Sequence, residues 1–439
     1  MIYNKEKVIW RVRAMKKRFA SIFIGAMMVF GISVSAKTTI EPTILVDQDG
    51  ILITATELDC EDDSAYGELK LKIENNSDIA VSITSGSIGY NRNAINNYMT
   101  NDCYMSVDIE AGKKAVEIID LGSYRKSYVD HKGIGTITMS FQVDDEDYDE
   151  LFCSTPIEIK TNKYDEIDYE DECFLRGIQD NEVQDRIGYV IDDIKEGEIF
   201  SSDGLVIDRY VTITKTDNEK IVLLEIENTT DSLMFFGVNG LNVNGINVYS
   251  GNWVTRAILP HKKAVVDVNL KDMIDYNYAN AIGFDDIKQA ALSLVSKDEE
   301  YNTLNVIETS IFGDDSSYEV NLSGNEVYNA NGIQIVAKDV VEQRYDNGDK
   351  VFVALVKNDN DFGIILNVPE DISVNDYMID TTCYSTNIDA NSIGIFYFQL
   401  DGDSLEDCDI TSFDKVEGAI EINDDHWNEL DIAEISTSF

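Results

Sequence analysis

The sequence predicts an all-β protein: three tandem immunoglobulin-like antiparallel β-sandwich domains after an N-terminal signal peptide. Short phrases recur three times in the same order, apolar residues often alternate with a period of two, and helical periodicity is almost absent. The first recurring phrase is Asp49-Gly50-Ile51, Asp203-Gly204-Leu205 and Asn331-Gly332-Ile333. A chain that repeats at this length is typical of an array of small domains, not of one large enzyme fold.

A second phrase follows the first in each copy and fixes the predicted domains. It occupies residues 73–78, 226–231 and, more loosely, 356–361. The predicted domains are residues 44–161, 198–312 and 326–439. An acidic linker is expected over residues 162–197, as a spacer that carries one short amphipathic helix or an extra strand. The last two domains are expected to sit closer together.

The first domain shows the strand pattern most clearly. Leu69–Glu74 alternates strictly, so its apolar side chains face one way and its charges the other. The other strands expected in this domain are Ile51–Thr56, Ile79–Ile83, Met105–Ile109, Val116–Ile119, Thr136–Val143 and Ile157–Ile159. Seven or eight short strands in roughly 120 residues are typical of a two-sheet sandwich, with one closed sheet as the alternative.

The other two domains repeat this order of strands. Ile221–Ile226 is more apolar than its counterpart, so both of its faces are expected to be covered. In the third domain Ile395–Leu400 is matched to the long strand Thr136–Val143 of the first. The tail Trp427–Phe439 is expected to supply a closing strand.

Composition and charge exclude some partners. The chain has 439 residues, 35 Lys+Arg against 82 Asp+Glu, and a formal charge of −47. Such a charge argues against nucleic acid and anionic lipid, because both bind through Lys and Arg. It fits cationic partners, divalent metals or simple solubility.

The N-terminus predicts export. Basic residues precede an uncharged run, Phe19–Ala36, which ends in Val34-Ser35-Ala36. These are the parts of a signal peptide, here residues 1–36, whose start is Met1 or Met15; an uncleaved anchor is the alternative. Since no second long apolar run follows, no membrane span is expected after cleavage. A secreted or extracytoplasmic, envelope-associated protein is expected.

Six cysteines allow 15 complete pairings in an exported chain. Cys103 and Cys383 stand in similar local sequence, and Cys153 and Cys408 each follow an acidic turn. We therefore expect the disulfides Cys103–Cys153 and Cys383–Cys408, with reduced thiols as the alternative. Without a Cys-x-x-Cys motif, no thiolate zinc site is expected.

The recurring phrases also resemble a known group of domains. The resemblance is carried by Asp49-Gly50-Ile51, Ile73–Asp78, Tyr98-Met99 and Gly112-Lys113-Lys114-Ala115. Together they are similar to a repeated β-sandwich domain of exported proteins and lipoproteins of gut clostridia. The resemblance implies export from a Gram-positive bacterium of the Firmicutes and a β-sandwich fold. It implies no activity and transfers no catalytic residue.

Motifs for catalysis are missing from the sequence. His131, His261 and His426 have no partner at a spacing that marks a catalytic triad. No nucleophile elbow, zinc-binding helix or phosphate-binding loop occurs either. No cofactor is expected, apart from a weak calcium site at Asp401, Asp403 and Asp407, because calcium binds clustered carboxylates. A solvated hairpin tip is the alternative for that cluster.

Aromatic residues recur at matching points of the three copies. Tyr104, Trp253 and Tyr384 form one such set, and Tyr98, Tyr249 and Tyr377 form another. Exposed aromatic rings stack on sugars or anchor protein contacts, whereas recurrence in every copy favours a core role. Both sets are therefore predicted to be core residues.

The sequence thus favours a non-catalytic extracytoplasmic binding or adhesion module. Its partner would be a protein or glycan at the cell surface, not nucleic acid. The alternatives are a structural spacer or envelope assembly subunit, and the accessory domains of a secreted hydrolase. A long uncovered edge strand would favour protein partners through strand addition.

Overall fold

The computed structural model describes residues 37–439 except 61–65, 86–91, 102, 122–127, 272–273, 275–277, 283–286, 314–318, 344–347 and 369–371. The predicted signal peptide, residues 1–36, lies outside the described residues. Residues 37–439 form one compact unit, and the predicted all-β class is confirmed. None of the helices in the described part of the chain is long and apolar enough to cross a membrane.

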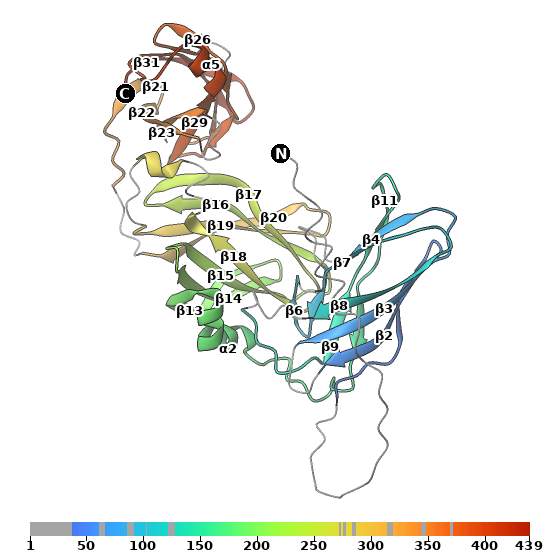
Figure 1. Ribbon diagram of the computed structural model, residues 1–439. Coiled ribbons are helices and arrows are strands. Elements are labelled where there is room, and N and C mark those ends of the chain that lie inside the picture. The colour runs from blue at the N-terminus through green and yellow to red at the C-terminus, as the bar shows by residue number, and fades with distance from the viewer. Residues whose placement is uncertain are drawn as a thin grey trace, which may run out of the picture. The chain divides into compact units, whose positions relative to one another are not determined.

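The first repeat is a sandwich of two sheets, drawn in blue and cyan in Figure 1. Its strands are β1 (Thr43–Gln48), β2 (Ile51–Cys60), β3 (Gly67–Asn75), β4 (Val81–Ser85), β5 (Ala94–Ile95), β6 (Tyr98–Met99), β7 (Met105–Ile109), β8 (Lys114–Leu121), β9 (Thr136–Met139), β10 (Gln142–Asp144), β11 (Glu150–Cys153) and β12 (Ile157–Lys160). One sheet has the order β1-β2-β3-β8. The facing layer has the order β11-β10-β4-β7 and continues as β12-β9-β5-β6.

The second repeat follows the same plan with longer strands. They are β13 (Tyr189–Ser202), β14 (Leu205–Lys215), β15 (Lys220–Asn228), β16 (Met234–Val243), β17 (Ile246–Ile258), β18 (Lys263–Asn269), β19 (Ala290–Lys297) and β20 (Thr303–Phe312), with the 3-10 helix η1 (Ala279–Ile282). Its sheets have the orders β13-β14-β15-β18 and β20-β19-β16-β17. Both faces of β15 are covered, as the sequence predicts.

The third repeat keeps the first sheet, and its second sheet has six strands. Its strands are β21 (Asn325–Ala330), β22 (Ile333–Glu342), β23 (Lys350–Asn358), β24 (Ile364–Asn367), β25 (Ile372–Val374), β26 (Tyr377–Ile379), β27 (Thr381–Thr382), β28 (Thr386–Ile388), β29 (Ser392–Leu400), β30 (Val416–Asp424) and β31 (Glu429–Thr437). The sheet orders are β21-β22-β23-β29 and β26-β25-β30-β24-β28, with β31 on β30. The predicted closing strand of the tail is therefore β31.

One predicted match in the third repeat was wrong. The strand that corresponds to β9 and β10 is β30, whereas Ile395–Leu400 belongs to β29, the counterpart of β8 and β18. The helix α5 (Gly402–Asp407) lies in the connection between β29 and β30. The apolar pattern alone does not show which of these two strands is the counterpart of Thr136–Val143.

The first recurring phrase forms a tight hairpin turn in every repeat. Asp49 has φ 50° and Gly50 has φ 84°, and the pairs at 203–204 and 331–332 have the same positive values. Two residues with positive φ make the turn whose twist matches antiparallel strands, which explains Asp-Gly and Asn-Gly there. This turn fixes the register of the first two strands of each repeat.

The second recurring phrase contains a buried asparagine that ties three segments together. Asn75 Nδ2 donates to the carbonyls of Ile79 at 2.8 Å and Ile109 at 3.0 Å, while its Oδ1 accepts from the Ser77 amide at 3.0 Å. Asn228 and Asn358 make the corresponding bonds. All three side chains are fully buried, so the phrase recurs because the fold needs it.

The hydrophobic cores also follow the repeats. One cluster lies within the first repeat and one within the third, while the cluster of the second also contains Val351, Val353, Leu355 and Ile395 of the third. The predicted boundaries stay a prediction, because sheets and this core continue across them.

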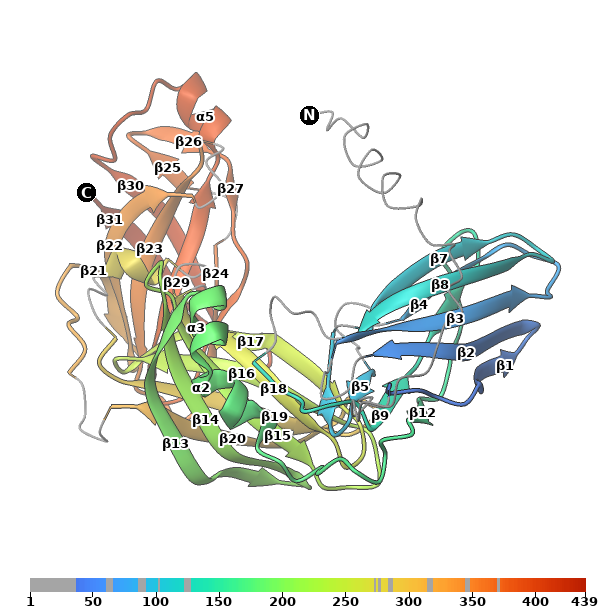
Figure 2. The same ribbon diagram turned by 60° about the horizontal axis from the view of Figure 1, so that its bottom comes forward.

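The segment predicted as a spacer is folded. It contains the helices α2 (Cys173–Gln179) and α3 (Asn181–Ile187), and β13 already begins at Tyr189. Phe174 and Ile178 of α2 pack on Val211 and Leu223, the outer face of the second repeat's first sheet (Figure 2). The helix and the extra strand expected as alternatives in this segment both occur, and apolar residues between the acidic ones bury against that sheet.

Candidate functional site, the strand edges at the repeat junctions

A hairpin tip of the first repeat pairs with an edge strand of the second. Strand β6 runs parallel to β18, with Tyr98 opposite Lys263. The Lys263 amide donates to the Asn97 carbonyl at 2.6 Å. The Lys262 Nζ donates to the Asn96 carbonyl at 2.8 Å. The second sheet of the first repeat thereby continues into the first sheet of the second.

The tip is held rigidly by its own repeat. Asn96 has φ 54°, and its Oδ1 accepts from the amides of Gly135 at 2.7 Å and Thr136 at 3.1 Å. Asn244 and Asn375 stand at the same turn of the other repeats, also with positive φ, and their Oδ1 atoms accept from backbone amides of β19 and β30 or the residues just before them. Each repeat therefore presents a preformed tip.

Tyr98 anchors this first junction. Its ring is buried with Phe174 and Val211, and its hydroxyl donates to the Glu225 carboxylate. Burial, followed by the charge of Glu225, raises the pKa of Tyr98 well above its ordinary value. His131 lies edge-on to this ring, with centroids 5.7 Å apart. Burial lowers the pKa of His131 to about 4, although Asp130 opposes the shift.

The second repeat joins the third through the same two elements. Strand β17 begins at the tip of the second repeat and runs parallel to β29, with Asn247 opposite Gly394. The Asn247 Nδ2 also donates to the Asp389 Oδ2 at 3.2 Å. In both junctions, a tip of one repeat meets the edge strand that closes the first sheet of the next.

The two junctions have the same register. Each junction contains one edge-strand residue, Ala264 or Gly394, whose partner on its own sheet lies two positions before the buried asparagine of that repeat. Ala115 is the corresponding residue of the first repeat. Asn247 and Met99 each lie three positions after the asparagine of their tip. Because parallel strands advance together, Tyr98 opposite Lys263 places Met99 next to Ala264, as Asn247 is next to Gly394.

Two ends of this array remain open among the described residues. Strand β8 closes the sheet β1-β2-β3-β8, and β26 ends the sheet that starts with it. On β8, Val116 is 57% and Ile118 59% exposed; on β26, Tyr377 is 54% and Met378 61% exposed. Among the described residues, the edge strand β8 of the first repeat therefore has no hairpin tip paired with it, and the tip of the third repeat at β26 has no edge strand to pair with.

The open ends have the sequences of a formed junction. The edge of the first repeat reads Lys113-Lys114-Ala115-Val116, and the occupied edge of the second reads Lys262-Lys263-Ala264-Val265. The tip of the first repeat reads Asn96-Asn97-Tyr98-Met99, and that of the third reads Asn375-Asp376-Tyr377-Met378.

Two polar pockets lie beside the first junction and share Asn97. One, of about 310 Å³, is lined by residues that include Lys132, Lys163 and Asp171. The other, of about 210 Å³, is lined by residues that include Tyr164 and Tyr169. The two tyrosine rings lie 5.8 Å apart. Polar groups and paired rings at one opening suit a small polar ligand.

Charged groups at the second pocket are already paired. Lys262 lies 3.2 Å from the Glu158 carboxylate, and Lys263 lies 3.7 Å from that of Glu227. The His261 Nε2 lies 2.8 Å from the Asp231 Oδ1. Carboxylates and a histidine thus gather here, but their charges hold the junction together.

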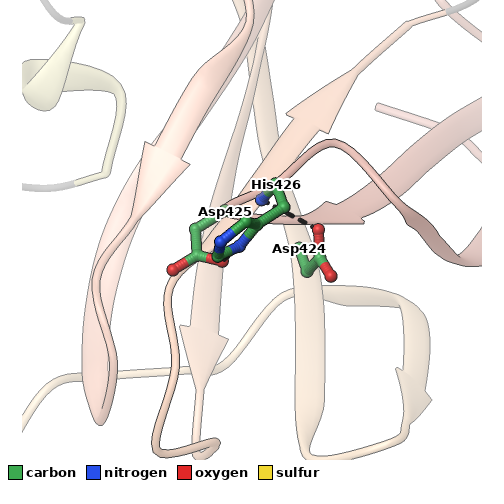
Figure 3. A group of neighbouring side chains, drawn as sticks. All are labelled: Asp424, Asp425 and His426. Atoms are coloured by element: carbon green, nitrogen blue, oxygen red, sulfur yellow. Dashed lines mark hydrogen bonds and ion pairs between the residues drawn. The ribbon is translucent and has the colours of Figure 1, made fainter.

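The predicted calcium triad does not form. Asp401 caps α5, where its Oδ1 accepts from the Ser404 amide at 2.8 Å, and Asp403 and Asp407 lie on the helix itself. Among the described residues, the only three-member group of His, Cys and acidic side chains with converging ligand atoms is Asp424, Asp425 and His426. Figure 3 shows this group at the turn between β30 and β31.

That group is explained by a turn present in every repeat. The Asp424 Oδ1 accepts from the amides of His426 at 2.9 Å and Asn428 at 2.8 Å. Asp145 and Asp298 make the same pair of bonds in the first two repeats. An aromatic residue with positive φ follows three positions later each time, namely Tyr148, Tyr301 or Trp427. The pattern Asp-x-x-aromatic-Asp/Asn was the signal in the sequence, and Asp424, not Asp401, is the counterpart of Asp145.

The cysteines are not bridged in the structure, which differs from the predicted Cys103–Cys153 and Cys383–Cys408 pairs. Cys103 is buried in the first core, whereas Cys153 is exposed on β11 because the alternation of that strand turns Phe152 inward. Cys408 caps the end of α5, before β30, whereas Cys153 lies on β11, after β10, so the two are not counterparts. The acidic turns that suggested the pairing are not equivalent.

The predicted core aromatics divide. Tyr98 is buried, but Tyr104, Tyr377 and Tyr384 are exposed, which contradicts a core role for these three. The side chains of Tyr249 and Trp253 lie outside the described residues. Recurrence of an aromatic residue did not predict its burial. The three repeats share the position of the residue, but they do not share the neighbouring segment that would cover its side chain.

Comparisons with known proteins give no family. No protein-family model and no curated protein matches the chain. Among solved structures, red sea bream transglutaminase matches with 10% identity and a TM-score of 0.13, covering 63% of this chain and 31% of that one. The exo-chitosanase CsxA of Amycolatopsis orientalis matches with 7% identity and a TM-score of 0.17, covering 92% and 79%. This chain thus spans about a third of the transglutaminase. At these TM-scores neither likeness bears on function.

Proposed function

We propose that the protein is a non-catalytic, exported binding or adhesion protein of a Gram-positive cell envelope, which captures a protein partner as an added strand along β8. The supporting observation is that β8 spans Lys114–Leu121 and has no neighbour on its outer side among the described strands. An edge strand offers unpaired backbone groups to any extended segment, and pockets for alternate side chains add specificity.

The side chains of β8 make it selective. Lys114, Glu117 and Asp120 put charge along the edge, which opposes indiscriminate pairing. Val116 and Ile118 present exposed apolar side chains between them. A partner strand therefore needs apolar residues in alternate positions and charges that match.

Peptide selection tests this function. Random eight-residue peptides displayed on phage are selected on the immobilised chain from Lys37 to Phe439. We expect enrichment of peptides in which apolar residues alternate with polar ones. Their affinity for the Ile118→Asp variant should be at least about tenfold lower than for the wild type, a loss of roughly 1.4 kcal/mol in binding free energy. Ile432→Asp is the matched control, because Ile432 is also an exposed strand residue but lies on β31. Equal loss in both variants, or no enrichment, contradicts the proposal.

A second candidate function is glycan binding at the junction pockets. It is favoured by Tyr164 and Tyr169, whose paired rings stand beside carboxylates and lysines. Sugars are held by such combinations of ring faces and hydrogen-bonding groups. A glycan array should then give a signal that Tyr164→Ala removes and Tyr148→Ala, at an exposed hairpin tip, keeps. A signal that survives Tyr164→Ala places glycan binding elsewhere.

A further inference from the structure

We infer that the chain assembles head to tail, with the tip of the third repeat of one molecule pairing with the open edge β8 of the first repeat of another. The inference rests on the proposed function, since it names the partner of β8 as a second copy of this chain. It continues a contact that the molecule already makes twice, between its own successive repeats.

The register of the new contact follows from the two existing ones. Tyr377 would lie opposite Lys114, as Tyr98 lies opposite Lys263. Lys114 pairs with Glu74 on β3 as Lys263 pairs with Glu227 on β15. Its amide therefore points outward, like the Lys263 amide that donates across the first junction.

Each hydrogen bond of the first junction has a counterpart. The Lys114 amide would donate to the carbonyl of Asp376, which stands where Asn97 does. The Lys113 Nζ would donate to the Asn375 carbonyl, as the Lys262 Nζ donates to that of Asn96. The charges suit each other, because two lysines face a tip that carries an aspartate.

The side chains differ in one respect. At the first junction Tyr98 bonds to Glu225, which is opposite Val265, whereas Lys72 is opposite Val116 in the first repeat. The Tyr377 hydroxyl can accept a hydrogen bond from the Lys72 ammonium. Its ring would cover the exposed side chain of Val116. Among the described residues, the helices that bury Tyr98 have no counterpart on this face, so the contact between molecules is weaker than the one within the chain.

Geometry then determines the kind of assembly. Tip and edge are different surfaces at opposite ends of the array, so the contact is heterologous and adds molecules one after another. Within one chain, the linker holds successive repeats at a high effective concentration, which favours the contact between them. Separate molecules lack this advantage. A small interface of this kind is expected to associate at roughly 10 μM to 1 mM. The charge of −47 opposes association, so screening by salt favours it.

Sedimentation tests the inference with two complementary variants of the chain from Lys37 to Phe439. Lys114→Pro removes the donor amide of the edge, and the double variant Tyr377→Asp, Met378→Asp changes only exposed side chains of the tip. The wild type should grow in weight-average mass with concentration at about 0.15 M salt. Each variant alone should stay monomeric. An equimolar mixture of the two should stop at dimers, because each supplies the surface that the other lacks.

Controls separate this inference from the proposed function. Tyr148→Asp, at an exposed tip outside the contact, should assemble like the wild type. A wild type that is monomeric at about 1 mM, or one whose growth persists in Lys114→Pro, overturns the inference. If the monomeric chain still binds strand peptides through β8, the proposed function stands and only self-assembly fails. If peptide binding is absent as well, both fail.

Discussion

Strands β8 and β18 both begin with Lys-Ala-Val after another lysine and have the same register on their neighbours, yet one edge is covered and the other is open. The Lys263 amide of β18 meets the carbonyl of Asn97 from the preceding repeat. Among the described strands, none pairs with the outer side of β8. Whether an edge is covered therefore depends on the neighbour it meets and not on its own residues.

The outer faces of the same two sheets differ for a related reason. On the second repeat, Leu223 and Val211 are buried under α2 and by Tyr98. On the first repeat, Lys70 and Lys72 alternate with buried leucines, so the outer face is charged. A covered sheet face can be apolar throughout, whereas a solvated one must alternate.

Removal of the buried asparagines should have the largest effect and should act equally on the open and the covered edge. Asn75→Ala and Asn228→Ala each leave buried carbonyls without their donors. We expect each variant to lose about 3 kcal/mol of unfolding free energy, measured by guanidinium denaturation. A loss of unfolding free energy below about 1 kcal/mol in either variant would show that the buried asparagine does not stabilise the two repeats equally.

Acid should loosen the covered junction and leave the open edge unaffected. Burial lowers the pKa of His131 to about 4, from 6.5 when unfolded. The neutral folded form is therefore favoured, and its stabilisation is complete above pH 6.5 and lost as the pH falls toward 4. We expect His131→Gln to remove about 2 kcal/mol of the acid sensitivity seen in thermal or denaturant unfolding.

The matched control for this pH dependence is His261→Gln. His261 is an exposed histidine paired with Asp231. It should leave the acid sensitivity of the wild type in place. If His131→Gln follows the wild-type profile throughout pH 4–6.5, His131 does not carry the effect.

Proline at equivalent positions of the two edges should separate them directly. Lys263→Pro removes a donor that is used within the chain, so unfolding free energy should fall by about 1 kcal/mol. Lys114→Pro, measured at low protein concentration, removes only a donor to water and should have much less effect, since edge strands tolerate proline. Equal losses would mean that the junction hydrogen bond contributes nothing.

Thiol reactivity should show the smallest effect, with no change in stability, and it tests the predicted disulfides. Cys153 is exposed, although burial of its sulfur and a hydrogen bond to Glu150 raise its pKa to about 11. Cys103 is buried. Alkylation followed by mass spectrometry should label Cys153 before Cys103. Protection of both until reduction would instead establish the Cys103–Cys153 bridge.

Local patterns in the sequence were sufficient for the fold but not for the junctions. Strict alternation predicted β3, and continuous apolar sequence predicted the covered β15. These features depend on residues close together in the chain. The matching of Asp401 and Cys408 failed because β29, instead of β30, was taken as the counterpart of Thr136–Val143.

The candidate site escaped prediction because it depends on which repeat touches which. The segment Gly112–Ala115 was noted only as one of the recurring phrases, and Tyr98 and Tyr377 were predicted to be core residues. Nothing in either sequence distinguishes a tyrosine that meets an edge strand from one that meets water. Only the order of strands shows that β6 and β17 enter the next repeat while β26 ends its sheet.

Amide hydrogen exchange at Lys263 and Lys114 is the most direct test of the account. The account predicts that the Lys263 amide is protected in the monomer, because it donates to Asn97. The Lys114 amide should exchange as an open amide in dilute solution and become protected as the concentration rises. Equal protection of the two amides in the dilute monomer would contradict the claim that one edge is occupied and its twin is open.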